Sequence, residues 1–420
     1  MRVGGPAERV ITADSRESLV LHALDLWRLD DPWLLLGGGS NTIVSDEGFP
    51  GTVLLARNTG IELVSEARSD GRVRLRVQAG HHWDHLVAFT VERGWAGLEA
   101  LSGIPGLAGA APMQNIGAYG AELADVLHSI EFLDADTHEV VRLGAAELEL
   151  SYRSSVLKQG REGVVLSIDV VLDADAGGLS SPVRYGQLAE RLGAQLGDRV
   201  PLRELRDTVL ALRRSKAMVL DEADHDSWSA GSFFTNPIVT ESFARTLPTD
   251  APRYVVDEGE TPPTVIALED LQRGAALPQP RKASPRTVKL SAAWLIEHSG
   301  ITRGFRLPGS GAAISSKHTL AITNRGGASA ADVAELARFV VQRVQQEFGV
   351  ILVPEPRVYG LEIRPEAHGR ISSAAGEHLY SQQSKLRECA QCGRAGAAAC
   401  VVYCEPRACR AQNRPIALRQ

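Results

Sequence analysis

A run of three glycines, a serine and an asparagine between two apolar stretches most constrains how this chain can fold: LLLGGGSNTIV, residues 34–44. The dinucleotide fingerprint G-x-G-x-x-G does not fit, because its third glycine position falls on Thr42 and the following Ile43 and Val44 favour a strand. The phosphate-binding loop does not fit either, since no Gly-Lys-Ser/Thr follows. The pattern predicts a strand–turn–strand whose exposed N–H groups bind an anion such as a pyrophosphate. A tight glycine-rich hairpin turn explains the same residues equally well.

Length and composition predict a cytoplasmic protein of two or three domains. The 420 residues are 44% hydrophobic and 23% charged, which is enough to bury several cores. A formal net charge of −6 gives no basic surface for nucleic acid or an anionic membrane. No stretch approaches ~18 uncharged apolar residues, and the opening MRVGGPAERV lacks the apolar segment of a signal peptide. Residues 1–388 contain no cysteine and therefore no disulfide framework.

A second glycine-rich stretch, LSGIPGLAGAAPMQNIGAYGAEL, spans residues 101–123. Its glycines are Gly103, Gly106, Gly109, Gly117 and Gly120. A backbone with so few side chains can lie against a flat ligand or a second backbone. Long glycine-rich loops in compact domains are usually functional or disordered, so we favour a ligand over a packed turn. Gln114, Asn115 and Tyr119 add hydrogen-bonding side chains.

Apolar periodicity predicts an α+β protein, because the strands are too unevenly interrupted for a doubly wound sheet. The clearest helix is SAADVAELARFVVQRVQQEFG, where Ser329 and Asp332 resemble a capping box and Gly349 ends the helix. Other helices are expected over residues 17–27, 81–94, 201–214 and 289–300. Strands are expected over residues 33–38, 51–56, 72–80, within 128–143 and over 317–324, with a proline-rich connection near 248–263.

Three short polar segments are candidates for a site. LSYRSSVLK places Tyr152 and Arg153 among serines and a lysine, a mixture suited to an anion, although such residues more often form a solvated strand end. WSAGSFFTNPIV places Ser232 beside two aromatic residues; it is either a proton donor or a turn serine, and the segment is not the G-x-S-x-G of hydrolases. LVPEPRVYG isolates Glu355 between two prolines, a rigid placement for a carboxyl group.

All five cysteines lie in the last 32 residues, downstream of a polar stretch. Their spacing begins C-x2-C-x7-C-x3-C, which departs from zinc-binding patterns, and no histidine lies among them. We therefore expect residues 365–420 to be a disordered tail and expect no metal site. The cysteines are Cys389, Cys392, Cys400, Cys404 and Cys409.

Taken together, eight ordered blocks resemble the UDP-N-acetylenolpyruvoylglucosamine reductase family, the bacterial flavoenzymes that complete UDP-N-acetylmuramate for peptidoglycan. The resemblance covers residues 2 to about 362. The blocks are RVGGPA, LGGGSN, SGIPGLAGAAPMQNIGAYG, SYRSSVLK, AGSFFTNP, KLSAAWLIE, SSKHTLAITN and PEPRVYG. Family members usually carry further residues before the first block, so a missing first strand and weaker cofactor binding are expected here.

The resemblance implies an FAD-binding fold of the vanillyl-alcohol-oxidase type, followed by a C-terminal α+β substrate-binding domain. It places the first FAD subdomain at residues 1–63, completed by about 355–364, the second at 64–216 and the substrate domain at 217–354. It also implies non-covalent FAD, held near its pyrophosphate by the first glycine-rich loop. The implied FAD-binding residues are Gly37, Gly38, Gly39, Ser40, Asn41, Gly103, Ile104, Pro105, Gly106, Gly109, Gln114, Asn115, Gly117 and Ala118.

The family's catalytic positions fall on Arg153, Ser232 and Glu355. Hydride transfer to an enolpyruvyl ether builds negative charge on C2 and its carboxylate, and C2 must then take a proton. A guanidinium and a protonated or hydrogen-bonded carboxyl group can stabilise that charge, and a nearby hydroxyl can deliver the proton. The resemblance also implies NADPH as reductant, reacting at the same site in a ping-pong cycle, and a monomer that acts on UDP-N-acetylglucosamine enolpyruvate. Positions that hold substrate or NADPH are Tyr152, Tyr185, Arg213, Lys216 and Asn236.

Two other functions compete with this interpretation. Another oxidase or dehydrogenase on the same fold would attach its flavin covalently, for which His81 and His82 are candidates. We prefer non-covalent FAD, because the resembled family binds it so and no cysteine lies nearby. A non-catalytic nucleotide-sugar-binding or zinc-dependent interaction protein would have lost Arg153, Ser232 or Glu355, and all three are present.

Overall fold

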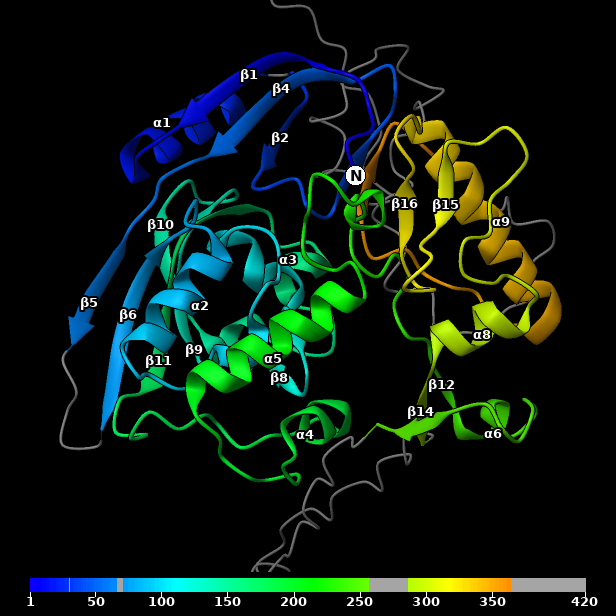
Figure 1. Ribbon diagram of the computed structural model, residues 1–420. Coiled ribbons are helices and arrows are strands. Elements are labelled where there is room, and N and C mark those ends of the chain that lie inside the picture. Colours follow the sequence, from blue (N-terminus) through cyan, green and yellow to red (C-terminus); the bar gives the residue numbers. More distant parts are fainter. Residues whose placement is uncertain (30, 66–70, 257–285, 364–420) are drawn as a thin grey trace, which may run out of the picture.

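The computed structural model describes residues 1–29, 31–65, 71–256 and 286–363. In Figure 1 the N-terminal half of this part lies on the left, and the segment that contains α8, α9, β15 and β16 lies on the right. The cysteine-containing tail and the end of the proline-rich connection, from residue 257 on, lie outside the described residues. None of the described helices is long and apolar enough to cross a membrane. The domain boundaries given above stay predictions.

The first sheet is parallel and three-stranded, in the order β1-β4-β2, and α1 packs against it. Its elements are β1 (Ala7–Ala13), α1 (Arg16–Arg28), β2 (Trp33–Leu36) and β4 (Phe49–Ala56). Ser15 begins α1, with its Oγ accepting the Ser18 N–H at 3.1 Å. The buried face of α1 also contacts Val164 and Leu166 of the second sheet, so this helix lies between the two sheets. The helix and strands expected in this region are confirmed.

The second sheet is antiparallel and five-stranded, in the order β10-β9-β11-β6-β5. Its strands are β5 (Ile61–Ser65), β6 (Arg72–Gln78), β9 (Leu127–Asp134), β10 (Val140–Gly144) and β11 (Gly163–Asp173). Because side chains alternate along a strand, β6 sends Val73, Leu75 and Val77 into the core beneath α2 and its arginines to the other face. The associated helices are α2 (Trp83–Glu92), α3 (Val156–Gln159), α4 (Gly186–Leu192) and α5 (Leu202–Ser215).

The C-terminal segment forms its own core around α9 (Ala330–Phe348). Val333, Leu336, Val340 and Val344 lie on one face of α9 and are fully buried. The capping box of Ser329 and Asp332 is confirmed. The other elements are β12 (Ile238–Thr240), α6 (Glu241–Ala244), β13 (Arg253–Val255), β14 (Thr287–Leu290), α8 (Ala292–His298), β15 (Ala312–Ile314) and β16 (Ile322–Asn324).

Short elements connect these units. The two-residue strands are β7 (Gly117–Ala118) and β8 (Ala121–Glu122). The 3₁₀ helices are η1 (Glu99–Leu101), η2 (Ala108–Gln114), η3 (Leu123–Asp125), η4 (Ala145–Leu148) and η5 (His225–Ser227).

The first glycine-rich loop does not close a hairpin. β2 pairs with β4, whereas β3 (Thr42–Val44) pairs in parallel with β17 (Arg357–Tyr359) near the end of the described chain. The hairpin alternative is therefore wrong, because each flanking strand finds its partner elsewhere. The loop instead joins two separate sheets, which leaves its backbone free of hairpin pairing.

The strand expected over residues 317–324 is only partly correct. β16 covers residues 322–324, whereas residues 318–321 form a turn in which Ala321 N–H donates to His318 O at 3.0 Å. The Ser315 hydroxyl accepts the N–H groups of Lys317 and His318, at 3.1 and 3.2 Å. This local side-chain bonding competes with a strand ladder and is the reason for the shorter strand.

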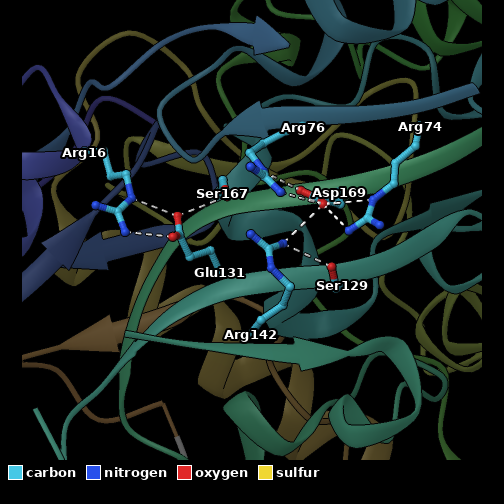
Figure 2. Close-up of polar contacts among 8 residues, drawn as sticks. All are labelled: Arg16, Arg74, Arg76, Ser129, Glu131, Arg142, Ser167 and Asp169. Atoms are coloured by element: carbon cyan, nitrogen blue, oxygen red, sulfur yellow. Dashed lines mark hydrogen bonds and ion pairs between the residues drawn. The ribbon is translucent and has the colours of Figure 1, made fainter. Parts of the chain in front are cut away.

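A buried carboxylate organises one face of the second sheet (Figure 2). Asp169 on β11 is fully buried and accepts bonds from three arginines: Arg74 and Arg76 of β6 and Arg142 of β10, with closest N–O distances of 2.5, 3.0 and 3.1 Å. Burial by itself raises the pKa of Asp169, but the hydrogen bonds and charges of these arginines outweigh it and hold the pKa below its ordinary value.

The same face ties the first sheet to the second. Arg16, at the start of α1, makes a two-pronged bond to Glu131 of β9, at 2.7 and 2.9 Å. Figure 2 shows this pair beside the Asp169 cluster, with Ser167 between them. A bidentate arginine–carboxylate bond fixes orientation as well as distance. It therefore helps to set how the first glycine-rich loop faces the second sheet.

Replacing Asp169 by Asn should destabilise the fold by on the order of 2 kcal/mol at neutral pH, because three guanidinium groups lose their shared anion. Since the folded pKa is depressed, this stabilisation is complete above the ordinary Asp value of about 3.9 and is lost as pH falls through the lower folded value. Urea midpoints measured from neutral pH down into acid should show a constant gap between wild type and D169N that narrows below about pH 4. The exposed Asp136→Asn is the matched control, and equal midpoints for the two variants would contradict this account.

Candidate active site

The two glycine-rich loops lie directly against each other. A Cβ on Gly38 would come within 3.2 Å of the Cα of Gly106, and one on Gly106 within 3.1 Å of Ser40 Oγ. The Ser40 hydroxyl donates to Pro105 O at 3.5 Å. Gly106 has a φ of +114°, a conformation that residues with side chains rarely adopt. Close approach of the two backbones is thus the structural reason for glycine at Gly38 and Gly106.

The first loop fits a pyrophosphate. Within the described part of the chain, the N–H groups of Gly38, Gly39 and Ser40 donate to no protein acceptor. Successive free N–H groups on a loop with a positive φ, here +64° at Gly39, form a concave anion-binding surface. The residues present therefore fit the diphosphate of FAD, the cofactor expected at this loop.

The second half of the long glycine-rich stretch is held rigidly. Gly109 packs against Ala79, where a Cβ would come within 2.5 Å of the Ala79 Cβ. Asn115 is fully buried in a left-handed conformation, donates to Glu122 at 2.8 Å and accepts the Ala124 N–H at 3.0 Å. The Asn115 side chain therefore shapes the loop. Gln114 instead reaches toward the candidate catalytic carboxylate.

Glu355 and Arg153 meet, although they come from distant parts of the chain. Arg153 Nε lies 3.6 Å from Glu355 Oε1, and Gln114 Nε2 donates to the same oxygen at 2.9 Å. The Arg153 guanidinium also donates to Gly117 O at 2.8 Å. On the other side, the Asn41 side chain donates to Glu355 O at 3.3 Å. Residues from both glycine-rich loops thus surround this ion pair.

Arg153 has a strained backbone. Its φ of +53° lies in the left-handed region, which costs a bulky residue about 1–3 kcal/mol. Lys158 Nζ donates to Arg153 O at 2.9 Å, and the Ser151–Ser154 bridge closes the turn beneath it. Burial lowers the pKa of Lys158, with Glu355 acting in the opposite direction. The strain is consistent with a residue held in place for its side chain.

Ser232 reaches the same region through the backbone of its neighbour. Phe233 N–H donates to Leu320 O at 2.7 Å, and Phe233 O accepts the Glu355 N–H at 2.8 Å. The Phe233 side chain is fully buried in the C-terminal core. Ser232 Oγ lies 3.3 Å from Nε2 of His318. The segment of Ser232 is therefore bonded to the segment of Glu355, which in turn pairs with Arg153.

The predicted substrate-binding residues form two groups around this centre. In the first group, burial raises the pKa of Tyr152. Hydrogen bonds from Asn236 partly offset this rise. The Asn236 side chain also accepts the Ala292 N–H at 3.0 Å. Lys289 Nζ lies 4.7 Å from the centre of the Tyr152 ring.

The second group lies at α4 and the end of α5. The half-exposed Tyr185 packs edge-on against Tyr119, with ring centres 5.6 Å apart. Lys216 donates to Gln187 at 2.9 Å. Arg213 is buried, and its Nε and Nη2 donate to the carbonyl oxygens of Gly103 and Met218, at 3.1 and 3.0 Å. Arg213 therefore holds the second glycine-rich loop.

Sequence reasoning missed three residues at this centre. The sequence patterns place His318 only in a strand, show Phe233 only as an aromatic neighbour of Ser232, and indicate no role for Lys289. The one signal for His318 was a titratable side chain next to a lysine at the start of an apolar run. The contacts of all three join segments far apart in sequence, which periodicity does not reveal.

Replacing Gly106 by Ala should weaken FAD binding, because alanine tolerates the φ of +114° poorly and its Cβ would crowd Ser40. Strain of about 1–3 kcal/mol corresponds to roughly a 5- to 150-fold rise in Kd. Titration of apoprotein with FAD, followed by flavin fluorescence, measures the change. Gly327→Ala is the control, since its φ is not positive and nothing lies within 4 Å of its Cβ. An unchanged Kd in G106A would show that the close approach of the loops does not matter for the cofactor.

Comparison with protein-family models gives two matches. Residues 7–144 match a model described as FAD binding domain, and residues 222–359 match the UDP-N-acetylenolpyruvoylglucosamine reductase C-terminal domain. The expected α+β FAD-binding fold with a C-terminal domain is thereby confirmed.

Comparison with individual proteins agrees. A UDP-N-acetylenolpyruvoylglucosamine reductase of Leifsonia xyli is 58% identical over 369 residues, covering 86% of this chain and 97% of the relative. The one of Saccharopolyspora erythraea is 47% identical over 356 residues, covering 85% and 92%. The crystal structure of the Thermus caldophilus reductase has a TM-score of 0.52 at 25% identity, covering 85% of this chain and 94% of that one. This chain belongs to the UDP-N-acetylenolpyruvoylglucosamine reductase family.

Proposed function

We propose that this chain catalyses the NADPH-dependent, FAD-mediated reduction of UDP-N-acetylglucosamine enolpyruvate to UDP-N-acetylmuramate in peptidoglycan precursor synthesis. The single observation that supports it best is the Arg153–Glu355 ion pair beside the two glycine-rich loops, with Ser232 next to the residue whose carbonyl accepts the Glu355 N–H. The chemistry needs a cation to stabilise a developing anion, a carboxyl group to orient that cation, and a hydroxyl to deliver a proton. Arg153, Glu355 and Ser232 supply these groups.

When bound and reduced, FAD would supply a hydride for the enolpyruvyl double bond. The residues that would hold it are those of the two glycine-rich loops, with the free N–H groups of Gly38, Gly39 and Ser40 on its diphosphate. Non-covalent attachment is part of the proposal. A covalent link through His82 is disfavoured because this side chain is exposed and lies beside His85, with the two ring centres 5.0 Å apart.

Arg153 and Glu355 bind and orient the enolpyruvyl carboxylate. The Arg153 guanidinium is fixed by Gly117 O and by Glu355, so it is preorganised before substrate arrives. Preorganised charge stabilises a developing anion without reorganisation during the reaction. Glu355 is itself fixed by Gln114 and by its N–H bond to Phe233.

Ser232 delivers the proton to C2. Its hydroxyl lies on the segment clamped between the Leu320 and Glu355 backbones, which limits its motion. Substrate binding is assigned to Tyr152 with Asn236 on one side and to Tyr185 with Lys216 on the other. Arg213 contributes by holding the loop at Gly103. The monomeric state, the cytoplasmic location and the lack of nucleic-acid or membrane binding stay predictions.

Replacing Ser232 by Ala should leave reduction of the flavin by NADPH unchanged and slow its reoxidation by the enolpyruvyl sugar by about 10²–10⁴-fold, the range for loss of a general acid. Anaerobic stopped-flow absorbance measures the two half-reactions separately. The exposed Ser242→Ala on α6 is the matched control. Normal reoxidation in S232A would remove the serine from the mechanism, and slowing of both half-reactions would indicate damage to the cofactor site.

A further inference from the structure

His318 is the side chain that contacts the proposed proton donor. Its Nε2 lies 3.3 Å from Ser232 Oγ, a long hydrogen bond whose direction depends on the imidazole tautomer. The backbone of its turn is fixed by the Ser315 hydroxyl and by the Ala321 N–H. The two turns are joined because Phe233 N–H donates to Leu320 O at 2.7 Å. Backbone hydrogen bonds thus fix the segments that carry Ser232 and His318 relative to each other.

The surroundings of His318 oppose a positive charge on the imidazole. Burial is the largest cause, and the charges of Lys216, Arg303 and Arg213 add to it, lowering the pKa of His318 to about 4. Glu297 acts in the opposite direction, but it already accepts from Thr319 and lies 3.8 Å from Arg303. At neutral pH the imidazole is therefore uncharged, with one N–H and one bare nitrogen.

The two possible directions of the contact have different consequences. If Ser232 donated to Nε2, its proton would be held by the imidazole, and its transfer there would create the cation that the surroundings oppose. If Nε2–H donates to Ser232 Oγ, the serine's own proton is free to point at the substrate. The N–H also stabilises the negative charge that grows on Oγ as this proton leaves. Only the second arrangement assists a proton donor.

We propose that His318 is a positioning residue for the reaction, whose Nε2–H donates to Ser232 Oγ, aims the serine proton at substrate C2 and stabilises the serine alkoxide. This inference rests on the proposed function. In the step, the Oγ–H bond of Ser232 breaks, a C–H bond forms at C2 from the carbanion's electron pair, and the negative charge moves to Oγ. Water then returns a proton to Oγ, and His318 keeps its own proton throughout.

The test compares His318→Leu, which removes the N–H, with His318→Gln, whose amide can place an N–H near the same point. In the FAD-loaded protein, H318L should slow reoxidation of the reduced flavin by UDP-N-acetylglucosamine enolpyruvate by about 10- to 100-fold. Reduction by NADPH should stay at the wild-type rate, and H318Q should recover much of the loss. The exposed His298→Leu on α8 is the matched control and should behave as wild type.

A double-mutant cycle separates this role from simpler ones. If His318 acts through Ser232, adding H318L to S232A should cause little further slowing. A wild-type reoxidation rate in H318L, or an equal loss in both backgrounds, would overturn the proposal, the second result indicating direct contact with substrate. If H318L does not retain flavin, His318→Ala, which also removes the N–H, takes its place in both backgrounds. If the reduced flavin of the wild-type protein were not reoxidised by the sugar, both the proposed function and this inference would be wrong. If the wild-type flavin is reoxidised and H318L reacts at the same rate, only this inference is wrong.

Discussion

The candidate site depends on two backbone hydrogen bonds made by Phe233. Its N–H bonds the turn of His318 through Leu320, and its carbonyl oxygen bonds the N–H of Glu355, so one residue joins three segments. The buried Phe233 ring, seated in the core around α9, prevents this junction from moving. Because buried backbone groups must be paired, loss of either bond would expose an unsatisfied polar group as well as release the site.

Backbone hydrogen bonds also join the segment of Glu355 to the first glycine-rich loop. Arg357 N–H donates to Asn41 O at 3.0 Å, and β17 pairs with β3 immediately after the first glycine-rich loop. The position of Glu355 is thus coupled to the loop proposed to bind the FAD diphosphate. Arg16 and Glu131 fix the same loop's sheet to the second sheet, where Figure 2 shows the bond beside the Asp169 cluster. The first glycine-rich loop, Glu355 and the segment of Ser232 are thus joined by backbone hydrogen bonds and strand pairing.

Local sequence patterns predicted the features that depend on residues close together in the chain. The α9 capping box, the α1 helix and the alternation in β6 were all correct, because capping and amphipathic burial depend on near neighbours. Local patterns did not reveal the partner of β3, since the same glycine-rich turn fits a hairpin or a loop between sheets. Only the family resemblance, which completes the first subdomain with residues 355–364, pointed to this part of the chain. His318 was missed because the Ser315 hydroxyl diverts its segment from a strand. The family motifs predicted Arg153, Ser232 and Glu355, but only the fold shows that the Arg153 side chain pairs with Glu355 and that the residue after Ser232 bonds the Glu355 backbone.

The most direct test of the central claim is a single turnover without oxygen. Protein loaded with FAD and reduced by one equivalent of NADPH is mixed either with UDP-N-acetylglucosamine enolpyruvate or with UDP-N-acetylglucosamine, which lacks the enolpyruvyl group. The account predicts that only the first restores the oxidised flavin absorbance, with one equivalent of UDP-N-acetylmuramate formed. A flavin that stays reduced in the presence of the enolpyruvyl sugar would contradict it.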